Sequence, residues 1–253
     1  MNEHLVTVIT ATTGNEKLYD ALLSVKKQTY KNVEHYVVVD GLERKKEALK
    51  IINSFPGVKT LVLPYATGKD NYNGHRIYGA SSFLVEGKYL TFLDEDNYYE
   101  PDHIQSCVDL ATDGYDWVYS LRKIVDSKKN FICNDDCESL GKWKSVLNDN
   151  FVDVGCWFLS KSAALTVAPL WYRRARHPQE QPEVDRIITS TLMTHFEKFE
   201  CTRKYTLNYR VGNRTDSVQG EFFIKGNAVM NEAYGGKFPW NEEKKEETYT
   251  IEL

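Results

Sequence analysis

The stretch YLTFLDEDNYYEPDHI, from Tyr89 to Ile104, decides the fold. It begins with an apolar run, residues 89–93, which predicts a buried strand. The acidic run Asp94-Glu95-Asp96 follows at once, and Pro101 then stands where a helix begins. The acids therefore lie on a loop between a strand and a helix. In open α/β sheets ligands bind just outside the carboxyl ends of the strands, so we expect a binding site here.

Two aspartates one residue apart suit a hard divalent cation at this position. Mg²⁺ and Mn²⁺ prefer oxygen ligands and are often held by one or two carboxylates together with the phosphates of a substrate. Without a cation or solvent between them, neighbouring carboxylates would repel one another. An Asp-x-Asp tripeptide also occurs by chance on solvated turns. Its place between an apolar strand and a helix that starts with proline favours the metal site.

The composition is that of an ordinary globular protein. The chain has 253 residues and a net charge of −4, so a general nucleic-acid-binding surface is not expected. Five cysteines without regular spacing argue against a disulfide framework. The sequence has no visible signal peptide and no apolar run of membrane-spanning length. We therefore expect a cytoplasmic protein, and its oligomeric state stays open.

The first hundred residues alternate between strand and helix patterns. The spacing of Thr13 and Glu16 predicts a capping box before the first helix. The alternation predicts a parallel sheet with helices on both faces. The predicted strands are 5–10, 33–39, 58–63 and 89–93, and the predicted helices are 18–25, 43–55 and 77–85.

The second half is less regular. Residues 131–144 fit no pattern, and the charged tail from Asn241 onward is expected to be mobile. A basic aromatic loop, residues 171–178, joins two predicted helices. The predicted strands are 117–125, 154–159 and 205–211, and the predicted helices are 161–170 and 184–196.

These patterns resemble the family 2 glycosyltransferases, which have the GT-A fold. The resemblance implies an α/β fold with a mixed, mostly parallel central sheet flanked by helices. It also implies that a sugar passes from a nucleotide-sugar to an acceptor with inversion at the anomeric carbon. The matching runs stand in the family's order at residues 6–11, 24–30, 37–41 and 87–96, with weaker matches at 154–160 and 183–186.

The resemblance also implies a division of the chain. Residues 1–253 would form a single GT-A domain. Within it, residues 1–100 would bind the nucleotide-sugar and residues 101–215 the acceptor, and residues 216–253 would form a C-terminal extension.

Two positions depart from the family pattern. The second strand is followed by Asp40-Gly41-Leu42-Glu43, where the family usually has Asp-Asp-Gly-Ser. The acidic pair before a late helix is interrupted, because Val184 separates Glu183 from Asp185. Asp185 matches the catalytic position best, and Glu183 and Asp153 remain alternatives for the base.

By resemblance, Asp96 is the direct metal ligand, and Asp94 touches the ribose or a metal-bound water. Glu95 belongs to the same nucleotide-sugar-binding loop but should point away from the metal, since neighbours along a strand alternate. The expected cofactor is Mn²⁺ or Mg²⁺. Such an ion acts as a Lewis acid on the leaving nucleoside diphosphate.

Four further residues are expected at the base of the nucleotide-sugar, and Arg76 at its diphosphate. Asp40, at a strand end, can accept the N3–H of uracil or the N1–H of guanine; its alternative role is a helix N-cap. Thr10, Ala11 and Thr12 would line the base pocket, unless they form a plain turn.

Arg76 suits a diphosphate by bidentate bonding, and its alternative is an ordinary surface position. The basic loop 171–178 would close over the diphosphate or bind an acidic acceptor, or else be simply solvated. Trp157 and Trp171 suit either a sugar face or the core.

Asp185 is the candidate general base, at the start of a predicted helix. A positioned base contributes about 10²–10⁴ in rate. The alternative role of Asp185 is compensation of the helix dipole.

The expected partners are a UDP-sugar donor and a glycan or other hydroxyl acceptor. Two rival functions remain. A nucleotidyltransferase would carry a Gly-rich, basic loop after the first strand, and residues 11–15 are poor in both. A non-catalytic GT-A module would bind a nucleotide-sugar or glycan without turnover, and the intact Asp94 and Asp96 count against it.

Overall fold

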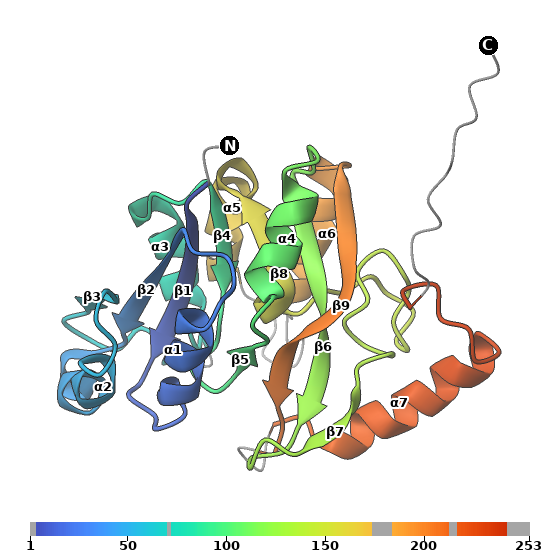
Figure 1. Cartoon of the computed structure of the whole chain (residues 1–253), viewed down its shortest axis with the longest axis horizontal. Coiled ribbons are helices and arrows are strands. Elements are labelled where there is room, and N and C mark those ends of the chain that lie inside the picture. The colour runs from blue at the N-terminus through green and yellow to red at the C-terminus, as the bar shows by residue number, and fades with distance from the viewer. Residues whose placement is uncertain (1–3, 70–71, 174–183, 213–216, 242–253) are drawn as a thin grey trace.

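The computed structural model of the chain describes residues 4–69, 72–173, 184–212 and 217–241, and the strands within these ranges form one sheet (Figure 1). The strand order is β3-β2-β1-β4-β8-β6-β9-β5, and β7 pairs with β6 beside this path. The strands are β1 Val6–Thr12, β2 Val33–Val39, β3 Lys59–Val62, β4 Tyr89–Phe92, β5 Tyr98–Tyr99, β6 Trp117–Val125, β7 Phe131–Asn134, β8 Trp157–Ser160 and β9 Phe199–Arg210.

The sheet is mixed, and its two halves differ. Parallel pairing joins β3, β2, β1 and β4, as the alternation of the first hundred residues predicts. Beyond β4, antiparallel pairing prevails, and the pairing of β6 with β9 is parallel. The expected predominance of parallel pairs therefore holds for the first half of the sheet.

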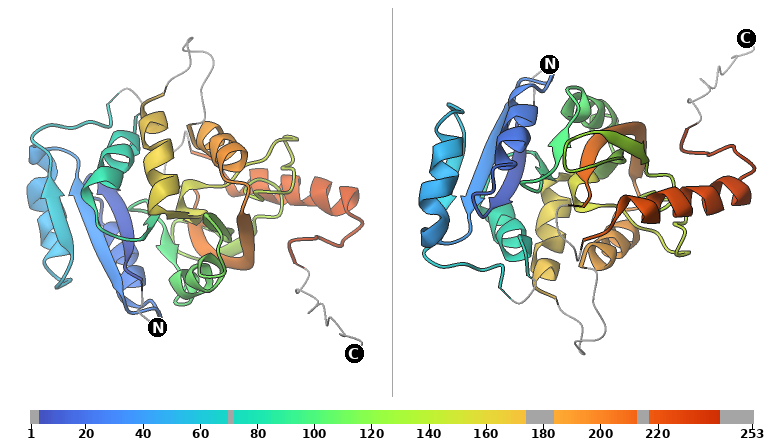
Figure 2. Two further views of the ribbon diagram at one scale, coloured as in Figure 1. Left: turned by 90° about the horizontal axis from the view of Figure 1, so that it is seen from above. Right: turned by 90° about the horizontal axis from the view of Figure 1, so that it is seen from below.

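Helices cover both faces of the sheet. Figure 1 shows α1 and α4 in front of the strands and α3, α5 and α6 behind them, and Figure 2 shows α7 at the opposite end from β3 and α2. Within the described ranges, every helix is too short or too polar to span a lipid bilayer. The helices are α1 Leu18–Lys26, α2 Lys45–Ile52, α3 His75–Leu84, α4 His103–Ala111, α5 Lys161–Val167, α6 Val184–His195 and α7 Gly220–Ala233, with 3₁₀ turns η1 Leu42–Arg44, η2 Val154–Cys156 and η3 Ala168–Tyr172.

The core explains the apolar runs of the sequence. Phe92 of β4 packs against Trp157 and Trp171, whose side chains are 0% and 1% exposed. Both tryptophans therefore belong to the core, and neither offers a face to a sugar. Leu18, Leu22 and other apolar residues of α1, β2 and α2 form a second, smaller core.

β8 begins where β4 ends, and this register places the site. The two strands are antiparallel, with Thr91 opposite Phe158. The residues just before β8 therefore lie beside the residues just after β4. As a result, Asp153, which precedes η2, reaches the loop that carries Asp94 and Asp96.

Gln28 ties α1 to the same region. Its amide nitrogen donates to the Glu100 carbonyl at 2.7 Å, and its amide oxygen accepts from the Ile104 backbone N–H at 2.9 Å. This contact gives a structural reason for the glutamine of the run 24–30, because it fixes the segment that follows the acidic loop.

The expected capping box at the first helix is wrong. α1 begins at Leu18, and its N-cap residue, Lys17, makes no side-chain capping bond. The Thr13 hydroxyl instead donates to Glu95 at 2.7 Å. A contact between distant segments has replaced the local one.

Four parts of the structure differ from the patterns in the sequence. Residues 131–134, which fit no pattern, form β7 as a hairpin with β6. The two-residue β5 and the whole of α7 were not predicted either. The expected strand at 154–159 begins as η2 before it becomes β8. The tail from residue 242 onward lies outside the described residues.

The segment after α7 folds back onto the body of the protein. Trp240 is fully buried, and its indole N–H donates to Asp136 at 2.7 Å. Its ring stacks on Phe238, with 4.8 Å between ring centroids. Tyr205 of β9 also donates to Asp136. One carboxylate thus joins the C-terminal segment to β9.

We expect Trp240→Ala to lower the free energy of unfolding by about 3–5 kcal/mol, because the change removes a fully buried indole and leaves a cavity. Urea denaturation measures this loss. Val229→Ala is the matched control on α7, since Val229 is 55% exposed, and surface changes of this kind stay within about 0.5 kcal/mol. Equal effects of the two variants would contradict the role of Trp240.

Candidate active site

Three segments bring aspartates to the carboxyl end of β4. Asp94 and Asp96 follow β4, Asp153 precedes η2, and Asp185 lies in the first turn of α6. Burial raises the pKa of Asp94 to about 7, with a further rise from the charges of Asp96 and Asp153. Burial likewise raises the pKa of Asp185 to about 6, with Asp153 adding to the rise. The charge of Asp153 thus acts on both Asp94 and Asp185.

Asp153 is held by a buried arginine that the sequence analysis did not select. Arg122 of β6 is 3% exposed and pairs with both Asp153 and Asp135. Burial raises the pKa of Asp153, and the charge of Arg122 opposes that rise. The signal in the sequence was the charged pair Arg122-Lys123 inside a predicted strand.

Glu95 holds the loop between β1 and α1. Its carboxylate accepts hydrogen bonds from the hydroxyls of Thr12 and Thr13 and from the backbone N–H groups of Thr13 and Asn15. These partners lie at the end of β1 and in the segment that follows it. The Glu95 carboxylate therefore has its hydrogen-bond partners within the protein itself.

Asp94 has a different partner. The phenol of Tyr78, on α3, donates to its Oδ1 at 2.6 Å. Tyr78 itself is buried against Phe92 and Trp171. The hydrogen bond therefore fixes the carboxylate from a rigid part of the core.

Asp40 organises the loop between β3 and α3. Its carboxylate accepts from the Thr67 N–H at 2.6 Å, the Thr67 hydroxyl at 2.8 Å and the Gly68 N–H at 2.9 Å. It does not cap a helix, because η1 starts after Gly41, whose φ of 113° suits glycine alone. A carboxylate has about four acceptor positions, and contacts within the described ranges use three of them.

Arg76 lies in the first turn of α3, beside the loop that Asp40 holds. Its guanidinium donates to the Thr67 carbonyl at 3.1 Å and lies 3.6 Å from the ring centroid of Tyr72. Tyr172, at the end of η3, stacks on Tyr72 with 5.6 Å between centroids. Arg76 is therefore part of a cation–aromatic stack at the edge of the site.

The side chains at the end of β1 lie in different surroundings. Thr10 is fully buried, and its hydroxyl lies 2.9 Å from His35 Nε2, so that hydroxyl is used in the core. Ala11 lies against Gly74, where any added Cβ would come within 2.9 Å of the Ala11 Cβ. Of the expected base-pocket residues, Ala11 has the side chain nearest the start of α3, and Thr12 serves Glu95.

Asp185 lies within the first turn of α6, and its Oδ1 accepts from the Arg186 N–H at 3.2 Å. The carboxylate thus serves the helix terminus, and the charge of Asp153 also acts on it. Glu183, the other half of the expected acidic pair, lies outside the described residues. So do Arg174, Arg176 and His177 of the basic loop.

The donor set suits a divalent cation. Among the described residues, no three His, Cys, Asp or Glu side chains are grouped so that they could hold a metal ion. Mg²⁺, however, is usually bound through one or two carboxylates plus substrate phosphates. The charge of Asp96 raises the pKa of Asp94, so these carboxylates are near enough to repel, and a cation would relieve the repulsion.

A mixed sheet of this order, with aspartates gathered at its carboxyl edge, defines the class: a GT-A type glycosyltransferase fold. The chain belongs to glycosyl transferase family 2, whose model matches residues 7–200. The family and the fold class expected from the sequence are thereby confirmed. No curated protein sequence matches the chain.

Solved structures of S. aureus TarS share the fold. TarS 1-349 in complex with UDP is 13% identical, with a TM-score of 0.60, over 90% of this chain and 64% of that one. The complex with UDP-GlcNAc is 13% identical, with a TM-score of 0.59, over 90% and 66%. A further structure of TarS 1-349 is 14% identical, with a TM-score of 0.59, over 81% and 60%. The chain thus spans less than two thirds of the length of these relatives.

The raised pKa of Asp94 links stability to pH. The pKa is about 7 in the fold against an ordinary value of 3.8, so between these values the folded state binds more protons than the unfolded state. The stabilisation is complete below the ordinary value and is lost as the pH rises towards 7.

We therefore expect the free energy of unfolding, measured in urea, to fall from about pH 5 to about pH 7.5, and to fall less in Asp94→Asn, which cannot ionise. Asp113→Asn, an exposed change after α4, is the control and should follow the wild type. The same pH dependence in all three proteins would show that Asp94 is not the group responsible.

Proposed function

We propose that the protein is an inverting glycosyltransferase that moves a sugar from a UDP-sugar to a hydroxyl group of a glycan or related acceptor, with Mg²⁺ or Mn²⁺ as cofactor. The observation that carries this proposal is the convergence of Asp94, Asp96, Asp153 and Asp185 at one edge of the sheet. In the proposed arrangement, residues 1–100 bind the donor and residues 101–215 the acceptor.

UDP is the favoured nucleotide for two reasons. The structures of S. aureus TarS that share this fold were solved in complex with UDP and UDP-GlcNAc. In the proposed arrangement, a fourth acceptor position of the Asp40 carboxylate takes the N3–H of uracil. Cytosine has no proton at N3, so a cytidine donor is disfavoured.

Asp94 and Asp96 are the proposed ligands of the cation. A bound divalent ion supplies Lewis-acid stabilisation of the charge that develops on the leaving diphosphate. The chain's own contribution is to hold these carboxylates in place, through Tyr78 for Asp94. Arg76, in the first turn of α3, is the proposed partner of the diphosphate.

Asp185 is the proposed base. The acceptor hydroxyl oxygen forms a bond to the anomeric carbon, the bond from that carbon to the diphosphate oxygen breaks, and Asp185 takes the hydroxyl proton. A pKa of about 6 leaves Asp185 ionised at neutral pH and close to the range in which a base works best. Asp153 is the weaker candidate, because Arg122 already compensates its charge.

The cytoplasm is the proposed compartment. All five cysteines are unpaired, and unpaired cysteines are usual where the surroundings are reducing.

The first test concerns the metal and the nucleotide. We expect UDP to raise the stability of the protein only with Mn²⁺ or Mg²⁺ present, by about 2.7 kcal/mol at a hundredfold excess over the dissociation constant. Asp96→Asn should lose most of this gain and still fold, whereas Asp113→Asn should keep it. Thermal-shift titration measures the gain, and an equal gain in EDTA would remove the metal from the proposal.

The second test concerns the base. We expect Asp185→Asn to reduce transfer by about 10²–10⁴ while calorimetry finds UDP affinity unchanged, because the carboxylate acts on the acceptor proton. Loss of a charge that only compensates the helix dipole costs about 0.3–1 kcal/mol of stability, so a residue that serves only the helix would leave transfer near normal. Near-normal release of UDP by a folded variant would therefore exclude Asp185.

A wild-type protein that binds UDP but transfers no sugar to any acceptor would favour a non-catalytic binding module.

A further inference from the structure

We propose that Arg186 positions the Asp185 carboxylate for catalysis by fixing the first turn of α6 to the loop between β7 and η2, residues 135–153. This inference rests on the proposed function and deepens it. Arg186 contacts no reacting atom in this arrangement, so it acts through Asp185. We call residues 135–153 the β7–η2 loop.

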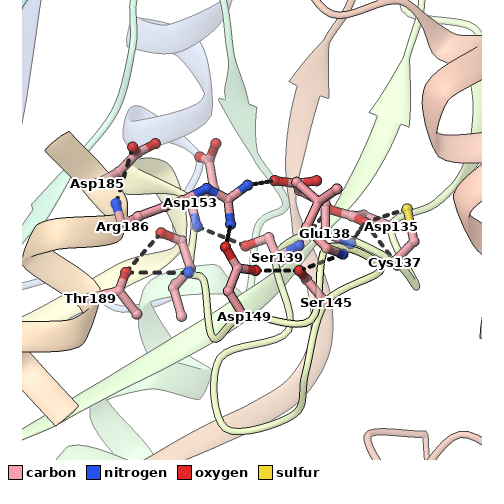
Figure 3. A network of polar contacts seen from close by, with 12 residues as sticks. Asp135, Cys137, Glu138, Ser139, Ser145, Asp149, Asp153, Asp185, Arg186 and Thr189 are labelled. Carbon is pink, nitrogen blue, oxygen red and sulfur yellow. Dashed lines mark hydrogen bonds and ion pairs between the residues drawn. The ribbon is translucent and has the colours of Figure 1, made fainter. Parts of the chain in front are cut away.

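Arg186 forms ion pairs with two residues of the β7–η2 loop. Its Nη2 pairs with Glu138 and its Nη1 with Asp149, as Figure 3 shows. Its guanidinium also lies 4.4 Å from the ring centroid of Phe151, near the end of the same loop. The side chain is 19% exposed, so water screens these pairs only in part.

A second contact joins α6 to the loop on the same side of the helix. The Thr189 hydroxyl lies 3.3 Å from the Val152 backbone nitrogen and 3.4 Å from its carbonyl oxygen. Arg186 and Thr189 are three residues apart, and such residues share one face of a helix. The two contacts therefore restrain rotation of α6 about its axis.

The β7–η2 loop is firm enough to act as an anchor. Asp135, at its start, accepts from the backbone N–H groups of Glu138 at 2.8 Å and Ser139 at 3.0 Å. Ser145 donates to Asp149 farther along, and these side chains form the network in Figure 3. Hydrogen bonds within the loop thus restrain both residues that pair with Arg186: Glu138 through its backbone N–H and Asp149 through its carboxylate.

The β7–η2 loop is also connected, through Asp153, to the other aspartates of the proposed site. Arg122 joins Asp135, at the start of the loop, to Asp153, at its end. The charge of Asp153 adds to the rise in the pKa of Asp185 that burial causes. Arg186 therefore sets the position of Asp185 relative to the proposed metal ligands.

Geometry, rather than charge, is the means by which Arg186 acts. Glu138 and Asp149 already neutralise its guanidinium. If Arg186 worked through its charge, removing it would shift the acid limb of the pH–rate profile. If it positions Asp185, that limb should stay where it is while the maximum rate falls.

A double-mutant cycle tests the proposal. The variants are Arg186→Met, Asp185→Asn and the double variant, assayed for UDP release with a responsive donor and acceptor. We expect Arg186→Met to lower kcat about tenfold to a hundredfold, since a misplacement of about 1 Å can cost a factor of a hundred. The affinity for UDP, measured by calorimetry, should not change. Adding Arg186→Met to Asp185→Asn should cause no further loss.

Two variants serve as controls. Lys142→Met removes an ion pair between the β7–η2 loop and Glu200 and should leave kcat unchanged. Arg186→Lys keeps one charge but not the planar fork that reaches two carboxylates, so it should be intermediate. A loss of rate as large in the Asp185→Asn background as in the wild type would overturn the proposal, and so would an equal effect of Lys142→Met.

Hydrogen exchange provides a readout that does not depend on turnover. Amides of residues 184–195 should exchange faster in Arg186→Met than in the wild type or in Lys142→Met. Unchanged exchange would show that Arg186 does not hold the helix, which overturns the proposal. Faster exchange in a protein that transfers no sugar would mean that the proposed function has failed, and catalytic positioning with it, while the link to the loop is real.

Discussion

A buried guanidinium between two aspartates is the interaction on which the site depends. Arg122 cannot stay in the core without compensation, since removing one partner of such a buried pair costs about 3–5 kcal/mol. Its two partners, Asp135 and Asp153, stand at the two ends of one long loop. A single side chain on β6 thereby closes that loop and brings Asp153 to the carboxyl end of β4.

Asp94 and Asp185 contrast with Asp153, whose charge pairs with Arg122. Asp94 and Asp185 are held in place by neutral hydrogen bonds, and burial together with the neighbouring acids raises the pKa of each. A cation on one side and a transferable proton on the other would each relieve this unfavourable charge. In the proposed reaction, repulsion between the same carboxylates would therefore favour both the binding of a cation and the uptake of a proton.

The sequence predicted the elements whose signals are local. Apolar runs and helical stripes located β1 to β4 and the helices between them, and the acids after β4 indicated the site. It did not predict the partners of those acids, because they are contacts between distant segments. Glu95 binds the loop after β1, which removes the expected capping box, and α7 owes its place to contacts with β6 and β7. Arg122 was visible only as one of two adjacent charged residues in a predicted strand.

The position of β8 has a consequence for how the protein folds. β1 to β3 pair with near neighbours in the chain and can form early, whereas β4 pairs on both sides with distant strands, β1 and β8. Contacts of such long range slow folding, because loop closure costs entropy before the contact is made. The aspartates therefore come together only once β8 has taken its place between β4 and β6. A nascent chain released before β8 would carry Asp94 and Asp96 at an unpaired sheet edge, where other strands can add.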